Sequence, residues 1–247
     1  MDGEGIDGID RVMMPQLLSE LSILMRALYR EDRELVRFWA WRFELANIKT
    51  LLRGKMSDCD EASLRNELVD LGAFSQVRLD KLLLSSDTAE LLRQLEHTVY
   101  ADFAREMRRS LRQQHELFTI DATIDRRYFS GLATRARSVG REARVLIGSM
   151  IDRVNLVWLL RYRFNYELSP AQSFYLLIPS GYSLSQQTML DLSRMESQQQ
   201  VLESLPEKFD TLLQGAHSIS EVTRRLEHHT WDACRHALSG RRFNPIR

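Results

Sequence analysis

We predict an all-α fold for this chain of 247 residues. Glycine and proline are scarce, at 11 and 5 residues, so few turns interrupt the chain and its elements should be long. Apolar residues recur at helical spacing over long stretches, for example at Leu17, Leu21, Leu24 and Leu28. The chain is long enough to bury a sizeable core, and 44% of its residues are hydrophobic, which is usual for a globular protein.

The N-terminal part of the sequence predicts two helices within residues 14–53, with a break near residues 31–32. Residues 1–10 are rich in Gly and Asp, and we expect them to form a disordered tail. Gly54 follows the last apolar turn of the second helix, with basic residues on either side. We therefore expect Gly54 to be the C-cap of that helix.

Caps and turn residues divide the rest of the chain into helices of unequal length. Residues 57–60 are a predicted loop, residues 86–88 and 121–123 offer N-caps, and Gly140 and the turn at 179–181 separate helices. Ser169 followed by Pro170 is typical of a helix start. The predicted helices are 61–70, 79–84, 88 to about 116, 124–137, 141 to about 164, one from 170, 184–205, 207–214 and 220–238.

An internal repeat is the most informative feature of the sequence. FELANIKTLLRGK at residues 43–55 matches IDRVNLVWLLRYR at 151–163 at one constant separation. A second echo pairs LRQLEHTVYADF at 92–103 with TRRLEHHTWDAC at 223–234, and it implies an insertion near 198–213 in the second copy. We expect each copy to contain a helix, a loop with glycine, a short helix and a long Leu-Glu-His helix. The positions matched in the first echo are Glu44 with Asp152, Asn47 with Asn155, and Arg53 with Arg161.

Two interpretations are open for the asparagine pair and for the acid pair. The asparagines could contact a partner protein, but we favour a buried hydrogen bond between helices. The acids could bind a basic residue of a partner, but we favour ion pairs with arginines of a neighbouring helix.

Composition argues against several functional classes. The formal net charge is zero, from 34 basic and 34 acidic residues, which disfavours a nucleic-acid partner. Cys59 and Cys234 form no CxxC pair, and the sequence has no phosphate-binding loop and no zinc-protease or serine-hydrolase motif. We therefore expect no catalytic residues, no cofactor and no metal. The apolar runs are too short to span a bilayer, so any membrane contact would be made through a partner.

Two charged patterns need interpretation. His228, Asp232 and His236 share one helix face, as metal ligands can, but their counterparts His97, Ala101 and Arg105 could not bind a metal together. We therefore favour a solvent-exposed face over a metal-dependent enzyme. Two arginine rows could contact nucleic acid, acidic lipid or an acidic partner, and we favour solvated or ion-paired faces. The rows are Arg105, Arg108, Arg109 and Arg112, and Arg135, Arg137, Arg141 and Arg144.

The first repeat copy resembles the signature of one family of V-type and A-type ATPase proteins, which comprises the C subunit of these enzymes and its vacuolar counterpart, the d subunit. The matching residues are Glu44, Asn47, Ile48, Lys49, Leu52, Arg53, Gly54 and Lys55. In the second copy they are Asp152, Asn155, Leu156, Trp158, Arg161 and Tyr162. The segments at 70–74, 124–132 and 179–182 also fit, so the resemblance covers roughly residues 15–245.

The resemblance implies a fold of three similar helical modules around a pseudo-threefold axis, forming a funnel. On that basis residues 11–55 are the remnant of a first module, 56–163 a second and 164–247 a truncated third, with parts of both ends of the family pattern lacking. The implied role is a non-catalytic central-stalk subunit that links the membrane rotor ring to the central axle and transmits torque. Its partners would be ring (proteolipid) and axle subunits, and its location the cytoplasmic face of the membrane. The alternative is a free-standing helical adaptor or regulator with the same fold.

Overall fold

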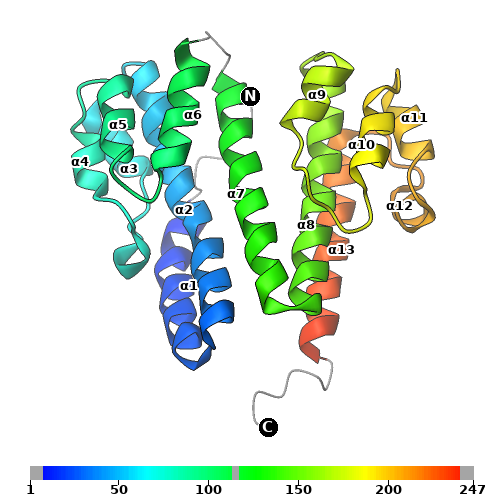
Figure 1. Ribbon diagram of the computed structural model, residues 1–247, viewed down its shortest axis with the longest axis horizontal. Helices are drawn as coiled ribbons and strands as arrows, with labels where there is room; N and C mark the ends of the chain where they lie inside the picture. Colours follow the sequence, from blue (N-terminus) through cyan, green and yellow to red (C-terminus); the bar gives the residue numbers. More distant parts are fainter. Residues whose placement is uncertain (1–7, 113–116, 240–247) are drawn as a thin grey trace. The chain divides into compact units, whose positions relative to one another are not determined.

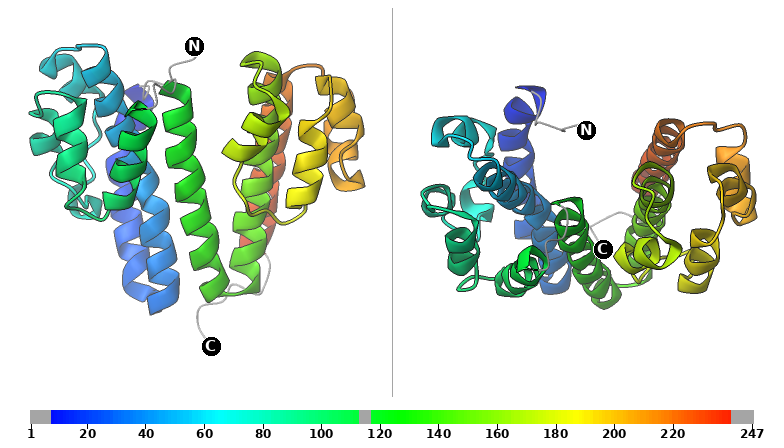
Figure 2. Two further views of the ribbon diagram at one scale, coloured as in Figure 1. Left: turned by 45° about the horizontal axis from the view of Figure 1, so that its top comes forward. Right: turned by 90° about the horizontal axis from the view of Figure 1, so that it is seen from above.

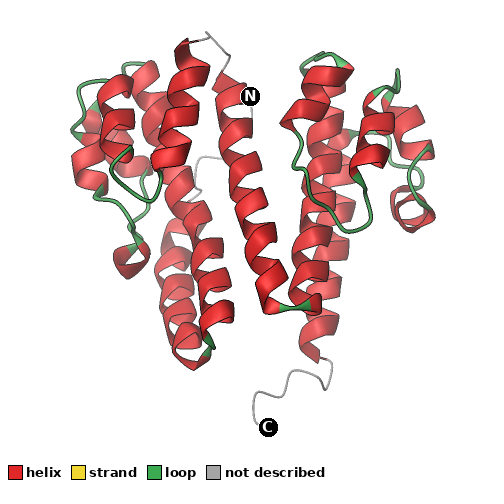
Figure 3. Ribbon diagram, viewed as in Figure 1, coloured by secondary structure: helices red, strands yellow, loops and turns green. Residues whose placement is uncertain are grey.

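The computed structural model describes residues 8–112 and 117–239, and the regular structure in these ranges is helical throughout, without a strand (Figure 3). The all-α prediction is confirmed. The chain divides by its internal contacts into two compact units, Met1–Tyr128 and Phe129–Arg247. Helix α7 (Leu117–Val139) runs across this boundary. The three-module arrangement and its boundaries stay predictions.

The first unit is built on the long helix α2. Its helices are α1 (Gly8–Ala27), α2 (Arg30–Met56), α3 (Glu61–Glu67), the 3-10 turn η1 (Gly72–Phe74), α4 (Leu79–Leu83), α5 (Thr88–Leu95) and α6 (Ala101–Arg112) (Figure 1). Buried apolar residues of α2, among them Leu45, Ile48 and Leu51, form the centre of the unit. The short helices α3 to α5 lie beside the α1–α2 pair (Figure 2).

The second unit repeats this plan around α8 (Arg141–Leu160). It also contains the π-helical turn η2 (Arg161–Asn165), α9 (Pro170–Leu176), α10 (Gln186–Ser193), α11 (Gln198–Glu203), α12 (Glu207–Leu213) and α13 (Ile219–Ser239). Long helices α8 and α13 pack together, and the short helices lie beside them (Figure 2). No helix in the described ranges has both the length and the apolar character needed to cross a bilayer.

Several predicted helix ends are confirmed by their caps. Asp60 accepts a hydrogen bond from the Ser63 amide at the start of α3, and Asp87 caps α5 in the same way. Ser169 and Gln172 form a capping box at α9, with Pro170 as the first helical residue. Gly140 separates α7 from α8 with a φ of 147°, a conformation that residues with a side chain rarely adopt.

The helix pair at the N-terminus divides earlier than predicted, between Ala27 and Arg30. Arg33 explains the position, because its guanidinium donates to the carbonyl oxygens of Met25 (2.9 Å) and Leu28 (3.0 Å) at the end of α1. The predicted break near residues 31–32 instead falls in the first turn of α2, where acidic residues are favourable. Of the predicted disordered tail, residues 1–7 lie outside the described ranges and 8–10 begin α1.

Gly54 is not a C-cap, which corrects the sequence prediction. It lies inside α2, which continues to Met56 and has Ser57 as its C-cap. A Cβ atom at Gly54 would lie 2.1 Å from a methyl carbon of Leu64 in α3. The glycine therefore permits close packing of two helices rather than a change of backbone direction.

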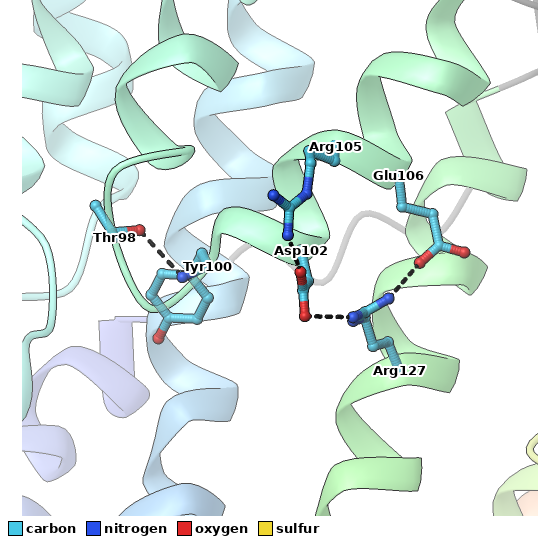
Figure 4. A network of polar contacts seen from close by, with 6 residues as sticks. All are labelled: Thr98, Tyr100, Asp102, Arg105, Glu106 and Arg127. Carbon is cyan, nitrogen blue, oxygen red and sulfur yellow. Dashed lines mark hydrogen bonds and ion pairs between the residues drawn. The ribbon is translucent and has the colours of Figure 1, made fainter.

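Three further predicted elements were wrong in their bounds. The helix expected from 88 to 116 breaks after α5, because the Thr98 hydroxyl donates to the Leu95 carbonyl (2.7 Å). The same hydroxyl accepts from the Tyr100 amide at 3.1 Å (Figure 4). Residues 113–116 of the expected helix lie outside the described ranges. Its Leu-Glu-His motif therefore ends a helix, whereas the second copy lies inside α13. The expected cap at 121–123 lies within α7, which begins at Leu117.

The helix expected over 184–205 is two helices, α10 and α11. Ser197 caps α11 by accepting from the Gln200 amide. Arg163 holds the intervening turn, because its guanidinium donates to the carbonyl oxygens of Ser193 (2.8 Å) and Met195 (3.2 Å). It also donates to the carbonyl of Leu168 (2.6 Å), so one side chain fixes two turns of the second unit.

Candidate functional site: paired helix–loop clamps

The two repeat copies place an acid and an asparagine on one face of a central helix in each unit. Glu44 and Asn47 lie one turn apart on α2, and Asp152 and Asn155 lie one turn apart on α8. All four side chains are buried, with at most 1% of each residue exposed. We call each acid–asparagine pair, with the loop that it binds, a helix–loop clamp.

The asparagines make the same two hydrogen bonds in both units. The Asn47 Nδ2 donates to the Val69 carbonyl (2.8 Å), and the Val69 amide donates back to Oδ1 (2.9 Å). The Asn155 Nδ2 donates to the Ile178 carbonyl (3.0 Å), and the Ile178 amide donates back to Oδ1 (2.8 Å). Each asparagine thus satisfies both backbone groups of one buried loop residue, as a neighbouring β-strand would.

The acid of the first clamp accepts hydrogen bonds from residues 75–77, the loop that follows η1. Glu44 accepts from the backbone amides of Gln76 (2.8 Å) and Val77 (3.1 Å) and from the Ser75 hydroxyl (2.6 Å). It also accepts from the Tyr100 hydroxyl at 2.6 Å. Burial raises the pKa of Tyr100, and the Glu44 carboxylate raises it further, so this phenol stays a donor.

The acid of the second clamp binds three consecutive amides. Asp152 accepts from the backbone N–H groups of Tyr182 (2.9 Å), Ser183 (2.6 Å) and Leu184 (3.1 Å). Burial raises the pKa of Asp152, although these three hydrogen bonds oppose the rise. Gly181 is required beside it, because a Cβ atom there would lie 2.3 Å from Asp152 Oδ1.

The clamps confirm part of the sequence interpretation and correct the rest. The asparagines are buried and hydrogen-bonded, but their partners are loop backbones rather than another helix. The prediction that Glu44 and Asp152 pair with arginines was wrong. A compact loop with consecutive buried amides needs an acceptor for each of them, and a carboxylate can serve two or three at once.

The basic residues of the motif lie outside the clamps. Lys49 forms an ion pair with Asp125 of α7, and Arg53 pairs with Asp121 of α7 at 2.9 Å. Burial raises the pKa of Asp121, opposed by Lys49 and Arg53. These two pairs attach α7 to α2 in the first unit. Lys55 lies half-buried in the last turn of α2, and Arg161 is exposed at the start of η2.

The two arginine rows differ in their environment. In the first row, Arg105 pairs with Asp102 and Arg108 with Glu96, as the ion-paired interpretation predicts. Asp102 also binds Arg127 of α7 at 2.8 Å, and Arg127 reaches Glu106 at 3.0 Å, so this row belongs to a network that joins α6 and α7 (Figure 4). The side chain of Arg112 lies outside the described residues. In the second row, Arg135 donates to the Gly131 carbonyl.

The candidate metal stripe is an exposed face at the two positions that the structure describes. His228 Nδ1 lies 3.0 Å from Asp232 Oδ2, and their side chains are 77% and 41% exposed. The side chains of Cys234 and His236 lie outside the described residues. Among the described residues, no three His, Cys, Asp or Glu side chains are grouped to hold a metal ion.

Sequence reasoning missed two residues that hold each unit together. Tyr100 binds Glu44 in the first unit, and Arg163 binds three backbone carbonyls in the second. Tyr100 follows the first Leu-Glu-His motif, where a break in the helix could not be read from apolar spacing. Arg163 occupies the last position of the second repeat stretch, opposite Lys55, so the alignment of the copies could have indicated it.

Comparison with known proteins gives a consistent result. A family model described as ATP synthase (C/AC39) subunit matches residues 1–246. The C subunit of the A-type ATP synthase of Halorubrum lacusprofundi is 27% identical over 147 residues, which are 58% of this chain and 40% of the relative. That of Methanocaldococcus jannaschii is 24% identical over 65% of this chain and 41% of the relative.

A third relative gives the broadest of these three alignments. The C subunit of the A-type ATP synthase of Methanothermobacter thermautotrophicus is 24% identical over 205 residues, 80% of this chain and 52% of the relative. The chain therefore spans 40% to 52% of the length of these three relatives.

Proposed function

The chain belongs to the ATP synthase (C/AC39) subunit family, and from this premise we propose that it is a non-catalytic central-stalk subunit of a rotary A-type or V-type ATPase. In this proposal it links the membrane rotor ring to the central axle and transmits torque during ATP-driven ion transport. It is peripheral, on the cytoplasmic face, and contacts the membrane only through the ring.

The observation that carries the proposal is the pair of helix–loop clamps. A torque-bearing subunit needs a stiff body, because flexible loops between helices would store rotation as deformation. In each clamp, backbone amides of a loop that lies beyond the next short α-helix donate to the buried asparagine and acid of the central helix, so this helix and that loop are held as one body. The polar groups of the motif are used in holding the fold, which suits a mechanical role better than a chemical one.

The duplication also supports the predicted modular architecture. Equivalent clamps on α2 and α8 are what repeated modules around a common axis would show. With the boundaries proposed at residues 55 and 163, each clamp joins one module to the next, because Asn47 binds Val69 and Asn155 binds Ile178. A third module and the funnel shape remain part of the proposal.

Affinity purification tests the proposal against the free-standing adaptor. The tagged chain would be expressed in its source cells, extracted in mild detergent and isolated, and the co-purifying proteins identified by mass spectrometry. The stalk proposal predicts recovery of both ring and axle subunits. Recovery of the chain alone, or with proteins unrelated to the ATPase, would favour the adaptor.

A matched pair of variants makes the purification more specific. Asn47→Ala removes both hydrogen bonds between the clamp asparagine and Val69, whereas Asn66→Ala changes an exposed asparagine of α3. If the clamps provide the stiff body that assembles, the first variant should reduce recovery of ring and axle subunits and the second should not.

A further inference from the structure

We infer that the second unit binds an acidic, amphipathic segment of a protein partner in a groove between α7, α8 and the loop held by Asp152. The groove has a volume of about 360 Å³, which is within the range of ligand-binding pockets. Ala133 and Ala136 of α7 and Ile147 and Ile151 of α8 line it with apolar side chains, and at most 9% of each of these residues is exposed. The exposed residues Arg137, Arg141 and Arg144 also line it, together with Ser180, Gly181 and Tyr182 of the loop held by Asp152. The inference concerns the second unit alone and does not depend on assembly of the chain into an ATPase.

The first unit supplies an internal comparison, because its equivalent region is filled. The repeat aligns Ile147 with Trp39 and Ile151 with Phe43. Trp39 and Phe43 pack edge to face, with ring centroids 5.6 Å apart, against the cluster that contains Val69, Leu71 and Phe74. Met14, Leu21 and Met25 of α1 cover the same cluster. The second unit has smaller side chains on its central helix and alanines on the preceding helix, and the space that they leave is the groove.

The arginines show the same contrast. Arg141 is the counterpart of Arg33, whose guanidinium is occupied by the carbonyls of Met25 and Leu28 within the first unit. Arg144 replaces the apolar Val36. Among the side chains that the structure describes, no carboxylate lies within ion-pair distance of Arg137, Arg141 or Arg144.

Two of these three cations also occupy positions that oppose helix stability. Arg141 and Arg144 lie in the first turns of α8, at the positive end of the helix dipole, where cations are unfavourable. Glu142 is the acid of this first turn. Three exposed arginines line the groove without a carboxylate partner among the residues that the structure describes, and they therefore fit an external anion better than a structural role.

The combination of charge and shape selects the class of occupant. An anionic membrane would meet a flat basic surface, whereas these arginines line a groove together with apolar side chains. Nucleic acid would need a longer basic track than three arginines on a chain with no net charge. An amphipathic helix with glutamates beside leucines can place its carboxylates on the arginines and its apolar side chains in the groove.

The test uses the full chain and a labelled helical peptide that carries Leu on one face and Glu at the flanking positions. Binding would be followed by fluorescence anisotropy at low and at moderate salt. The peptide should bind the unaltered chain, and a version with Gln for every Glu should bind at least about tenfold more weakly. This comparison needs no variant of the protein, so it stands whatever the variants do.

Protein variants then locate the site. Arg141→Gln combined with Arg144→Gln should weaken peptide binding by about tenfold, since each exposed arginine–carboxylate pair contributes modestly. Val145→Ser, in the groove lining, should weaken it without changing the salt dependence. Arg109→Gln on α6 is the matched control and should have no effect.

Three results would overturn the inference. The first is a loss of peptide binding with Arg109→Gln as large as the loss with the Arg141→Gln and Arg144→Gln double variant. The second is equal binding of the Glu and Gln peptides. The third is no peptide binding by a chain that does bind phosphatidylserine vesicles or a single-stranded oligonucleotide. The last would assign the arginines to a lipid or nucleic-acid surface instead.

Discussion

Replacing a clamp asparagine by alanine should be among the most destabilising single substitutions in its unit. Asn155→Ala removes both partners of the Ile178 backbone, whose residue is 3% exposed, and leaves one N–H and one C=O group buried without a partner. Each such group costs about 1–3 kcal/mol, so the loss of partners for two groups should lower the free energy of unfolding by about 2–6 kcal/mol. Asn47→Ala should cost a similar amount, because it releases Val69 from bonds of nearly identical length.

The assay is urea unfolding followed by helical circular dichroism, together with hydrogen exchange of the two clamped amides. Asn155→Ala should speed exchange at Ile178 and leave Val69 unchanged, and Asn47→Ala should do the reverse. Asn66→Ala, in an exposed asparagine of α3, is the control and should stay within about 0.5 kcal/mol of the unaltered chain. A cost for Asn155→Ala no larger than for this control would refute the assignment of the clamp as a main support of the loop.

Three further predictions concern the residues around the clamps. Gly181→Ala should reduce the free energy of unfolding by about 1–3 kcal/mol, because its Cβ would lie 2.3 Å from Asp152 Oδ1 and 2.7 Å from the Leu184 carbonyl oxygen; an unchanged urea midpoint would contradict the close contact. Since burial raises the pKa of Asp152, the folded state keeps the proton longer than the unfolded state, so the stability advantage of the unaltered chain over Asp152→Asn should shrink as pH rises from about 4. An advantage that grows with pH would mean that the three amide bonds outweigh burial. Lys49→Met should lower the free energy of unfolding in urea by about 1–2 kcal/mol, because it leaves Asp125 without its partner. Arg65→Met removes an exposed ion pair with Glu61 and should cost no more than about 0.5 kcal/mol. Equal costs would mean that the Lys49–Asp125 pair stabilises the fold no more than an exposed pair does.

The sequence predicted the helical class and most helix starts because their signals are local. Asp60, Asp87 and Ser169 are side chains that bind the backbone three residues on, so their type and spacing are sufficient to place a helix start. The repeat located all four clamp residues for a related reason, since duplicated stretches preserve residues whose contacts are duplicated.

The errors arise where a distant contact overrides a local preference. The break after α5 depends on Thr98 and on the burial of Tyr100 against Glu44, and no apolar periodicity records such a contact. Glycine often ends helices, so the sequence favours a cap at Gly54. In the structure a glycine is needed at this position because Leu64 approaches the backbone too closely for a Cβ atom. An acid on a helix often pairs with an arginine of a neighbouring helix, but Glu44 and Asp152 bind loop amides instead, and these loop residues are distant in the sequence.

Coupling of ATP hydrolysis to ion transport tests the proposed role most directly. Inverted membrane vesicles from cells with and without this chain would be compared for ATP hydrolysis and for ATP-driven ion uptake. A torque-transmitting stalk subunit predicts that vesicles without the chain lose ion uptake while the catalytic head still hydrolyses ATP, and that returning the chain restores uptake. Undiminished ATP-driven ion uptake in vesicles that lack the chain would contradict the account.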